Sequence, residues 1–105
     1  METKELQNSA SRVFLGNLKR DRIEPSEDYL VLKLAEELGE FVQSYLVHKK
    51  RCRPVKYLPA RKSKKKLATE LADVLGLVFV IATAHRIDIE DALVKKWITR
   101  EWIEK

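Results

Sequence analysis

The stretch TELADVLGLVFVIATA, residues 69–84, decides the fold of this chain. Between Leu71 and Ala84 the only polar side chains are Asp73 and Thr83. A run this apolar, with no strand-like alternation, predicts a helix that is buried on nearly every side. A carboxylate is costly in such surroundings unless it is neutralised, paired or bound to a metal. Asp73 is therefore the first candidate functional residue.

The composition predicts one helical globular domain over residues 1–105. The chain is 45% hydrophobic and 35% charged, and it has only three Gly and three Pro. No N-terminal stretch has the layout of a signal peptide, and the apolar run 71–84 is too short to cross a bilayer, so no membrane association is expected. Cys52 is the single cysteine, which excludes an internal disulfide and favours a cytoplasmic location.

Hydrophobic periodicity and punctuation predict four helices and no strands. Ser26 and Asp88 are candidate N-caps, and Pro54 and Pro59 interrupt the chain between the second and third helices. The predicted helices cover residues 4–20, 27–48, 63–84 and 89 to the C-terminus. Their expected apolar stripes include Leu6, Ala10, Val13, Phe14 and Leu18 in the first helix, and Leu30, Leu34, Leu38, Phe41, Val42 and Tyr45 in the second. The predicted fold class is all-α, a four-helix bundle.

The net charge of +5 comes from one segment. Ten of the 21 Lys and Arg residues lie between Phe41 and Thr69, where there is no Asp or Glu, so the rest of the chain holds 11 basic and 16 acidic residues. Such asymmetry indicates either an anionic partner near the segment or a solvated charged loop. We expect the loop to shape substrate access or to recruit an anion, with Lys64, Lys65 and Lys66 outside the core.

Two pairs of carboxylates recur at the same helical spacing. Each residue advances about 100° around a helix, so Glu37 and Glu40 fall on one flank of the stripe centred on Leu34. Glu70 and Asp73 fall on the corresponding flank of the third helix. If the two helices pack antiparallel, these four carboxylates converge, whereas Glu36 falls nearly opposite the core.

Four convergent carboxylates predict a site for a hard divalent cation, Mg²⁺ or Mn²⁺, because all their ligand atoms are oxygen. A di-iron site is not favoured, since neither His48 nor His85 has an acidic residue three positions before it. In the fourth helix Lys96 and Arg100 are spaced i, i+4, and they could bring positive charge toward an anionic ligand. The alternative is a pair of surface cations.

EELGE at 36–40, ELADV at 70–74 and HRIDIEDALVKKW at 85–97 together resemble the signature of the MazG-like all-α nucleoside triphosphate pyrophosphohydrolases. The resemblance covers about Tyr29 to Arg100. It implies Mg²⁺ ligation by Glu37, Glu40, Glu70 and Asp73, catalytic roles for Glu36 and Glu37, and contact of Lys96 with the substrate phosphates. Arg100 stands where many relatives have asparagine. The implied reaction cleaves a nucleoside triphosphate between the α and β phosphates to monophosphate and pyrophosphate, and removal of unwanted nucleotides is the role that it suggests.

Two other interpretations remain open from the sequence. Residues 49–66 could bind nucleic acid, but Tyr57 is their only aromatic residue, so a base-stacking platform is not favoured. The chain could also be a helical scaffold without turnover. The third helix is more apolar than three neighbouring helices require, which predicts a homodimer or homotetramer, with Phe79 or Val80 at the contact.

Overall fold

The computed structural model describes residues 1–102, and within them every regular element is a helix and none is a strand, as the sequence predicts. Four α-helices follow one another: α1 (Thr3–Arg20), α2 (Glu27–His48), α3 (Ala60–Ala84) and the short α4 (Ile89–Leu93). A 3₁₀ turn, η1 (Pro54–Lys56), lies between α2 and α3, and a π-helical turn, η2 (Val94–Ile98), continues α4.

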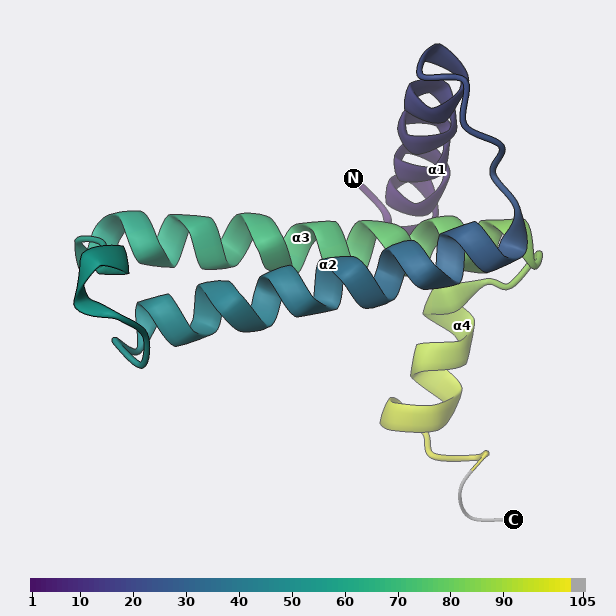
Figure 1. The fold of residues 1–105 in the computed structure, drawn as a ribbon. Helices are drawn as coiled ribbons and strands as arrows, with labels where there is room; N and C mark the ends of the chain where they lie inside the picture. Colours follow the sequence, from purple (N-terminus) through teal and green to yellow (C-terminus); the bar gives the residue numbers. More distant parts are fainter. Residues whose placement is uncertain (103–105) are drawn as a thin grey trace.

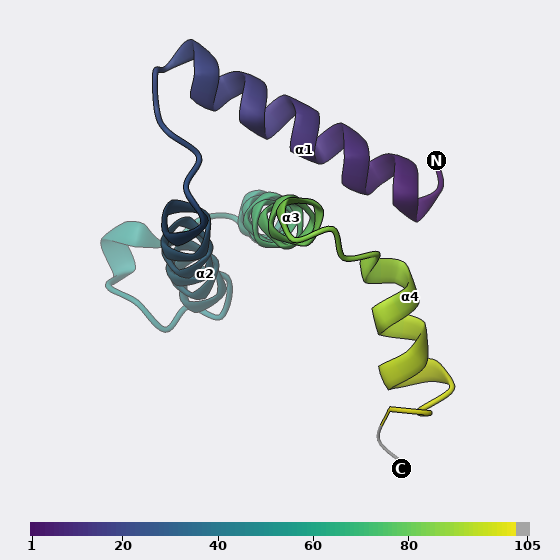
Figure 2. The same cartoon turned by 90° about the vertical axis from the view of Figure 1, so that its right-hand side faces the viewer.

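Helices α2 and α3 lie antiparallel and side by side, and they form the centre of the molecule (Figure 1). Helix α1 crosses α3 on one side of this pair, and α4 leaves it on the other side (Figure 2). Both predicted caps are present. The hydroxyl of Ser26 accepts a hydrogen bond from the Tyr29 amide at 3.1 Å, and the carboxylate of Asp88 accepts one from the Asp91 amide at 3.2 Å.

Helix α1 is held to the end of α3 by a polar side chain as well as by apolar packing. The buried Gln7 donates to the hydroxyl of Thr83 at 3.1 Å and to the carbonyl of Ile87 at 2.9 Å. Leu18 is buried, whereas Leu6 and Val13 of the predicted stripe are exposed. The position of α1 therefore depends on hydrogen bonds to the turn between α3 and α4.

Two predicted boundaries were wrong. Helix α3 begins at Ala60 rather than near Ser63, with Pro59 at its N-cap position, and Lys64, Lys65 and Lys66 lie in its first turns, within the predicted range 63–84. Helix α4 ends at Leu93 and passes into the π-helical turn, which ends at Ile98. The predicted extension of this helix over residues 103–105 lies outside the described residues.

The four helices do not close into a compact bundle within one chain. The radius of gyration is 16.4 Å, whereas a compact domain of this length has about 13 Å. The accessible surface is 8430 Å², against about 6,100 Å² for a typical monomer of this mass. One chain by itself thus exposes far more surface than its size requires.

The exposed surface includes much of the stripe that the sequence assigned to the core. Leu30 is buried and Leu34 and Phe41 are half-buried, but Leu38, Val42 and Tyr45 are exposed. The side of α2 that packs against α3 is rotated relative to the predicted apolar stripe. It includes Glu37 and Ser44 as well as leucine and phenylalanine. We call the exposed set Val31, Leu38, Val42, Leu71 and Leu75 the apolar face of the α2–α3 pair.

Helix α3 is long and apolar enough to cross a membrane by length and composition alone, with a mean hydropathy of 1.9 over its most apolar window. The apolar run 71–84, which by itself is too short to cross a bilayer, thus belongs to a helix of 25 residues. The core helix of a soluble protein meets the same criterion. In this structure α1 and α2 both pack on α3.

Candidate metal centre

Glu37 of α2 and Glu70 of α3 lie on the lines along which the two helices pack. Their side chains are only 12% and 15% exposed. The Oε2 atom of each is buried and has no hydrogen-bond partner. Two buried carboxylate oxygens without donors are costly, which marks this part of the interface as a site that is completed by something else.

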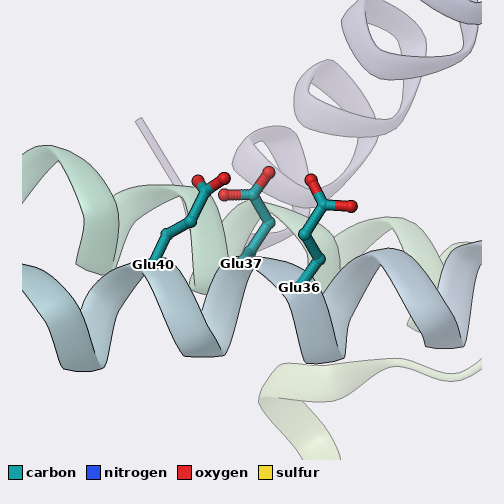
Figure 3. Close-up of side chains that lie close together, drawn as sticks. All are labelled: Glu36, Glu37 and Glu40. Carbon is teal, nitrogen blue, oxygen red and sulfur yellow. The ribbon is translucent and has the colours of Figure 1, made fainter.

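Further carboxylates surround this pair and form two groups that share Glu37. In one group the ligand atoms of Glu36, Glu37 and Glu40 lie within 4.8 Å of one another, and these three side chains project from one side of α2 (Figure 3). In the other group Glu37, Glu70 and Asp73 lie within the same distance. Three of the four predicted ligands, Glu37, Glu70 and Asp73, therefore come together, whereas Glu40 is grouped with Glu37 and Glu36. We call these five residues the carboxylate cluster.

Asp73 is not buried, contrary to the prediction from its apolar neighbours in the sequence. It lies on the flank of α3 beside a hollow of about 480 Å³ between α1 and α3. Leu71 and Leu75 each lie two positions from Asp73, which places them about 160° away around the helix. The side chains that surround Asp73 in the sequence thus point elsewhere in space. Its carboxylate is open to solvent and to a ligand.

Two lysines partly compensate the buried carboxylates. Lys33 Nζ lies 2.9 Å from Glu36 Oε1 and 3.7 Å from Glu37 Oε1, and Lys66 Nζ lies 3.9 Å from Glu70 Oε1. Each buried glutamate thus has a lysine one helical turn before it. The sequence analysis missed this role, although the signal, Lys-x-x-x-Glu at 33–37 and again at 66–70, is readable from the chain.

The electrostatic environment of Glu37 opposes its ionisation. Burial raises the pKa of Glu37, and its hydrogen bond with Glu40 and the charges of Glu40 and Asp73 raise it further, whereas Lys33 lowers it. The lysines therefore do not fully balance the acids. A divalent cation would reverse this effect, because it favours the ionised carboxylates.

These residues fit a hard divalent cation. All the donors are carboxylate oxygens from two helices that are packed against each other, and two of the buried oxygens have no other partner. No histidine or cysteine belongs to either group within residues 1–102, so the donor set is unlike that of a typical zinc site.

Lys96 and Arg100 follow helix α4 in the chain, in the π-helical turn and just after it. Helix α4 starts on the side of the α2–α3 pair opposite to the side from which Glu36, Glu37 and Glu40 project (Figure 3). Lys96 is exposed in the π-helical turn, and Arg100 follows it with a positive φ of 61°. The predicted i, i+4 alignment of the two is wrong, because Arg100 lies beyond the helical residues.

Comparison with protein families gives a match to the MazG nucleotide pyrophosphohydrolase domain over residues 25–102. The chain belongs to this family. The match includes α2, α3, α4 and all five residues of the carboxylate cluster, and only α1 precedes it. Neither a curated protein nor a solved structure matches the chain. Membership favours a soluble protein, and it favours a divalent-metal site at the carboxylate cluster.

Proposed function

We propose that this MazG-family chain is a Mg²⁺-dependent nucleotide pyrophosphohydrolase that cleaves ribo- or deoxynucleoside triphosphates between the α and β phosphates. The observation that carries the proposal is the meeting of two carboxylate groups at Glu37, across the α2–α3 interface, inside the matched domain. The products would be a nucleoside monophosphate and pyrophosphate. Removal of unwanted nucleotides is a role that such a reaction could serve.

Glu37, Glu40, Glu70 and Asp73 would hold the cation, with Mn²⁺ as an alternative to Mg²⁺. A bound Mg²⁺ supplies positive charge against the phosphate oxygens and favours ionisation of the attacking water. Glu36 is exposed at the edge of the cluster and would accept a proton from that water. Lys33 holds Glu36 at 2.9 Å and so fixes the direction of this carboxylate.

We propose further that the chain acts as a homodimer or a larger homo-oligomer whose contact is the apolar face. Leu71 and Leu75 are 52% and 51% exposed. They line a hollow of about 470 Å³ whose walls are entirely apolar. The excess of about 2,300 Å² of accessible surface over a typical monomer is of the size that obligate subunit interfaces bury. Phe79 and Val80, predicted for this contact, are buried within the chain instead.

Substrate binding by Lys96 and Arg100 remains a proposal that depends on this assembly. Because α4 leaves the α2–α3 pair opposite the glutamates, these cations would reach a carboxylate cluster only if it belonged to a second copy or if α4 moved. A mixed-subunit experiment tests this: a Lys96→Ala chain combined with an Asp73→Asn chain should regain activity if the site is shared between copies.

The function is tested by incubating the protein with Mg²⁺ and a panel of ribo- and deoxynucleoside triphosphates, followed by identification of the products. Monophosphate and pyrophosphate in equal amounts are expected. Release of orthophosphate alone would contradict the proposed reaction. No turnover with any nucleotide, together with Mg²⁺-dependent thermal stabilisation, would instead indicate a non-catalytic scaffold, and binding of nucleic acid alone would favour the basic-segment alternative.

A further inference from the structure

A third hollow, of about 510 Å³, adjoins the carboxylate cluster at the end of the α2–α3 pair that is closed by η1. Glu40 and Glu70 form part of its wall, so it opens directly onto the cluster. Lys66 of α3 and Lys56 of η1 form another part. Ser44 and Cys52 also line it. The hollow thus has acidic side chains on one part of its wall and basic side chains on another.

Ser44 supplies an observation that does not depend on charge. Its side chain is 3% exposed, and its hydroxyl oxygen has no hydrogen-bond partner. A serine within a helix commonly satisfies its hydroxyl by bonding the carbonyl four residues before it, and Ser44 does not. A buried hydroxyl of this kind is costly unless a ligand bonds it. Because Ser44 is one of the residues that line the hollow, a buried hydroxyl without a partner lies beside it.

The two lysines give the hollow a preference for anions. Lys56 is exposed, and it belongs to a segment from Phe41 to Thr69 that has ten cations and no acid. The ammonium group of Lys66 is shared with Glu70 at 3.9 Å. A cation bound by Glu70 would compete with Lys66 for that carboxylate, and the ammonium group would then be available to another anion. Cation binding and anion binding at the hollow should reinforce each other.

We propose that this hollow binds the pyrophosphate portion of the substrate, so that the phosphate chain runs from the carboxylate cluster toward η1. The assignment rests on the proposed function and adds a direction to it. Lys56 and Lys66 are the charge partners of the terminal phosphates, and the hydroxyl of Ser44 donates to a phosphate oxygen.

This placement has a consequence for the reaction. The oxygen of water forms a bond to the α-phosphorus, and the bond between that phosphorus and the bridging oxygen breaks. The bonding pair leaves on pyrophosphate, and a proton of the water passes to a carboxylate. Negative charge grows on the leaving group during this step, and lysines fixed beside it stabilise the charge where it develops. Lys56 and Lys66 thus favour departure of pyrophosphate as well as its binding.

Cys52 provides a local probe, because it is the single cysteine and lines the same hollow. The experiment measures the rate of Cys52 alkylation by iodoacetamide in Mg²⁺ buffer, with inorganic pyrophosphate or with an uncharged nucleoside as competitor. Each protein is compared with its own rate without competitor, since substitution of Lys56 itself alters the charge near the thiol. Pyrophosphate should slow alkylation and the nucleoside should not. Protection by the nucleoside alone would overturn the proposal.

A pair of double variants separates local contact from overall charge. Lys56→Gln with Lys66→Gln removes both lysines of the hollow, whereas Lys64→Gln with Lys65→Gln removes the same charge from exposed positions outside it. The first pair should raise the half-protecting pyrophosphate concentration at least about tenfold, and the second should change it less than about threefold. Equal effects of the two pairs would show that only the general field acts, and the assignment would fail.

Ser44→Ala tests the hydroxyl independently. It should leave the melting temperature of the ligand-free protein unchanged or higher, because an unpartnered buried group is removed, and it should weaken pyrophosphate protection. A lower melting temperature with unchanged protection would mean that the hydroxyl serves the fold alone. The failure modes are distinct: a protein that releases pyrophosphate from nucleotides but shows no pyrophosphate protection refutes this subsite, whereas protection without turnover refutes the proposed function.

Discussion

The two exposed flanks of the α2–α3 pair are built by one sequence pattern and present opposite chemistry. In α2, Leu38 and Val42 lie two positions before and after Glu40, and in α3, Leu71 and Leu75 stand in the same relation to Asp73. Positions two apart lie about 160° apart around a helix. Because the helices are antiparallel (Figure 1), this spacing puts the carboxylates on one flank and the apolar residues on the other, and Figure 3 shows three of the carboxylates together on one side of α2.

Both flanks are incomplete in a single chain, and they lack different things. The carboxylate flank has two buried oxygens without partners, which calls for a cation. The apolar face has leucines about half exposed, which calls for further apolar surface. The difference shows that one helical pair can support two separate binding events, and substitutions on one flank should leave the other largely intact.

The largest expected effect is on the apolar face. Leu71→Glu should place an unpaired charge in the proposed subunit contact and weaken association by at least about 3 kcal/mol, roughly a hundredfold in Kd. Leu32→Glu, at a leucine outside the apolar face that is 69% exposed against 52% for Leu71, is the control and should leave the assembly unchanged. Light scattering at micromolar concentration measures both. If light scattering finds the wild-type protein to be monomeric, the proposed subunit contact at the apolar face is wrong.

On the carboxylate flank, Asp73→Asn preserves shape and removes one charge. We expect it to lower Mg²⁺-dependent pyrophosphate release by about 100-fold or more, since even indirect partners of metal ligands cost 10–100-fold. The metal-free protein should be as stable or more stable, because repulsion within the carboxylate cluster is relieved, while the rise in melting temperature with Mg²⁺ should shrink.

The control for that variant is Asp28→Asn, which removes the same charge at the start of α2, away from the cluster. It should keep the Mg²⁺ response and the activity. If Asp73→Asn retained full activity, Asp73 would not be a ligand, and the exposed carboxylate would be only a surface charge.

The pH dependence of stability should sharpen the contrast between the flanks. The pKa of Glu37 is raised in the fold, so its protonated form is favoured there. This contribution to stability is complete below the ordinary glutamate pKa of 4.5 and is lost as pH rises through the raised value. In buffer that contains a metal chelator, urea unfolding of the wild-type protein should show this loss of stability as the pH is raised. Glu37→Gln should abolish this pH dependence of stability, whereas Leu71→Glu should preserve it.

The smallest expected effect is that of Glu36→Gln on stability. Its ion pair with Lys33 is exposed, so its loss should change the free energy of unfolding by only about 0.3–0.5 kcal/mol. Turnover should nevertheless fall if Glu36 accepts the proton of the attacking water, while the thermal response to Mg²⁺ persists. Loss of that thermal response would instead make Glu36 a metal ligand.

Local chemistry along the chain was enough to predict the helical fold and the composition of the site. Ser26 and Asp88 cap helices because their side chains accept amide hydrogens, and Pro54 and Pro59 prevent α2 and α3 from being one continuous helix. The i, i+3 spacing of Glu37 with Glu40, and of Glu70 with Asp73, puts each pair on one flank through helical geometry alone. These features depend on neighbours in sequence, so they could be read without a structure.

The tertiary structure alone decided which side of each helix is covered. Periodicity gives the direction of an apolar stripe only broadly, whereas the contact with the neighbouring helix sets its centre. That contact buried Ser44, half-buried Glu37 and Glu70, and left Asp73, Leu38 and Leu71 exposed. It also set the direction of α4, which leaves the α2–α3 pair on the side away from α1 (Figure 2). Burial and distance between helices arise from contacts between segments far apart in the chain, and no local pattern specifies them.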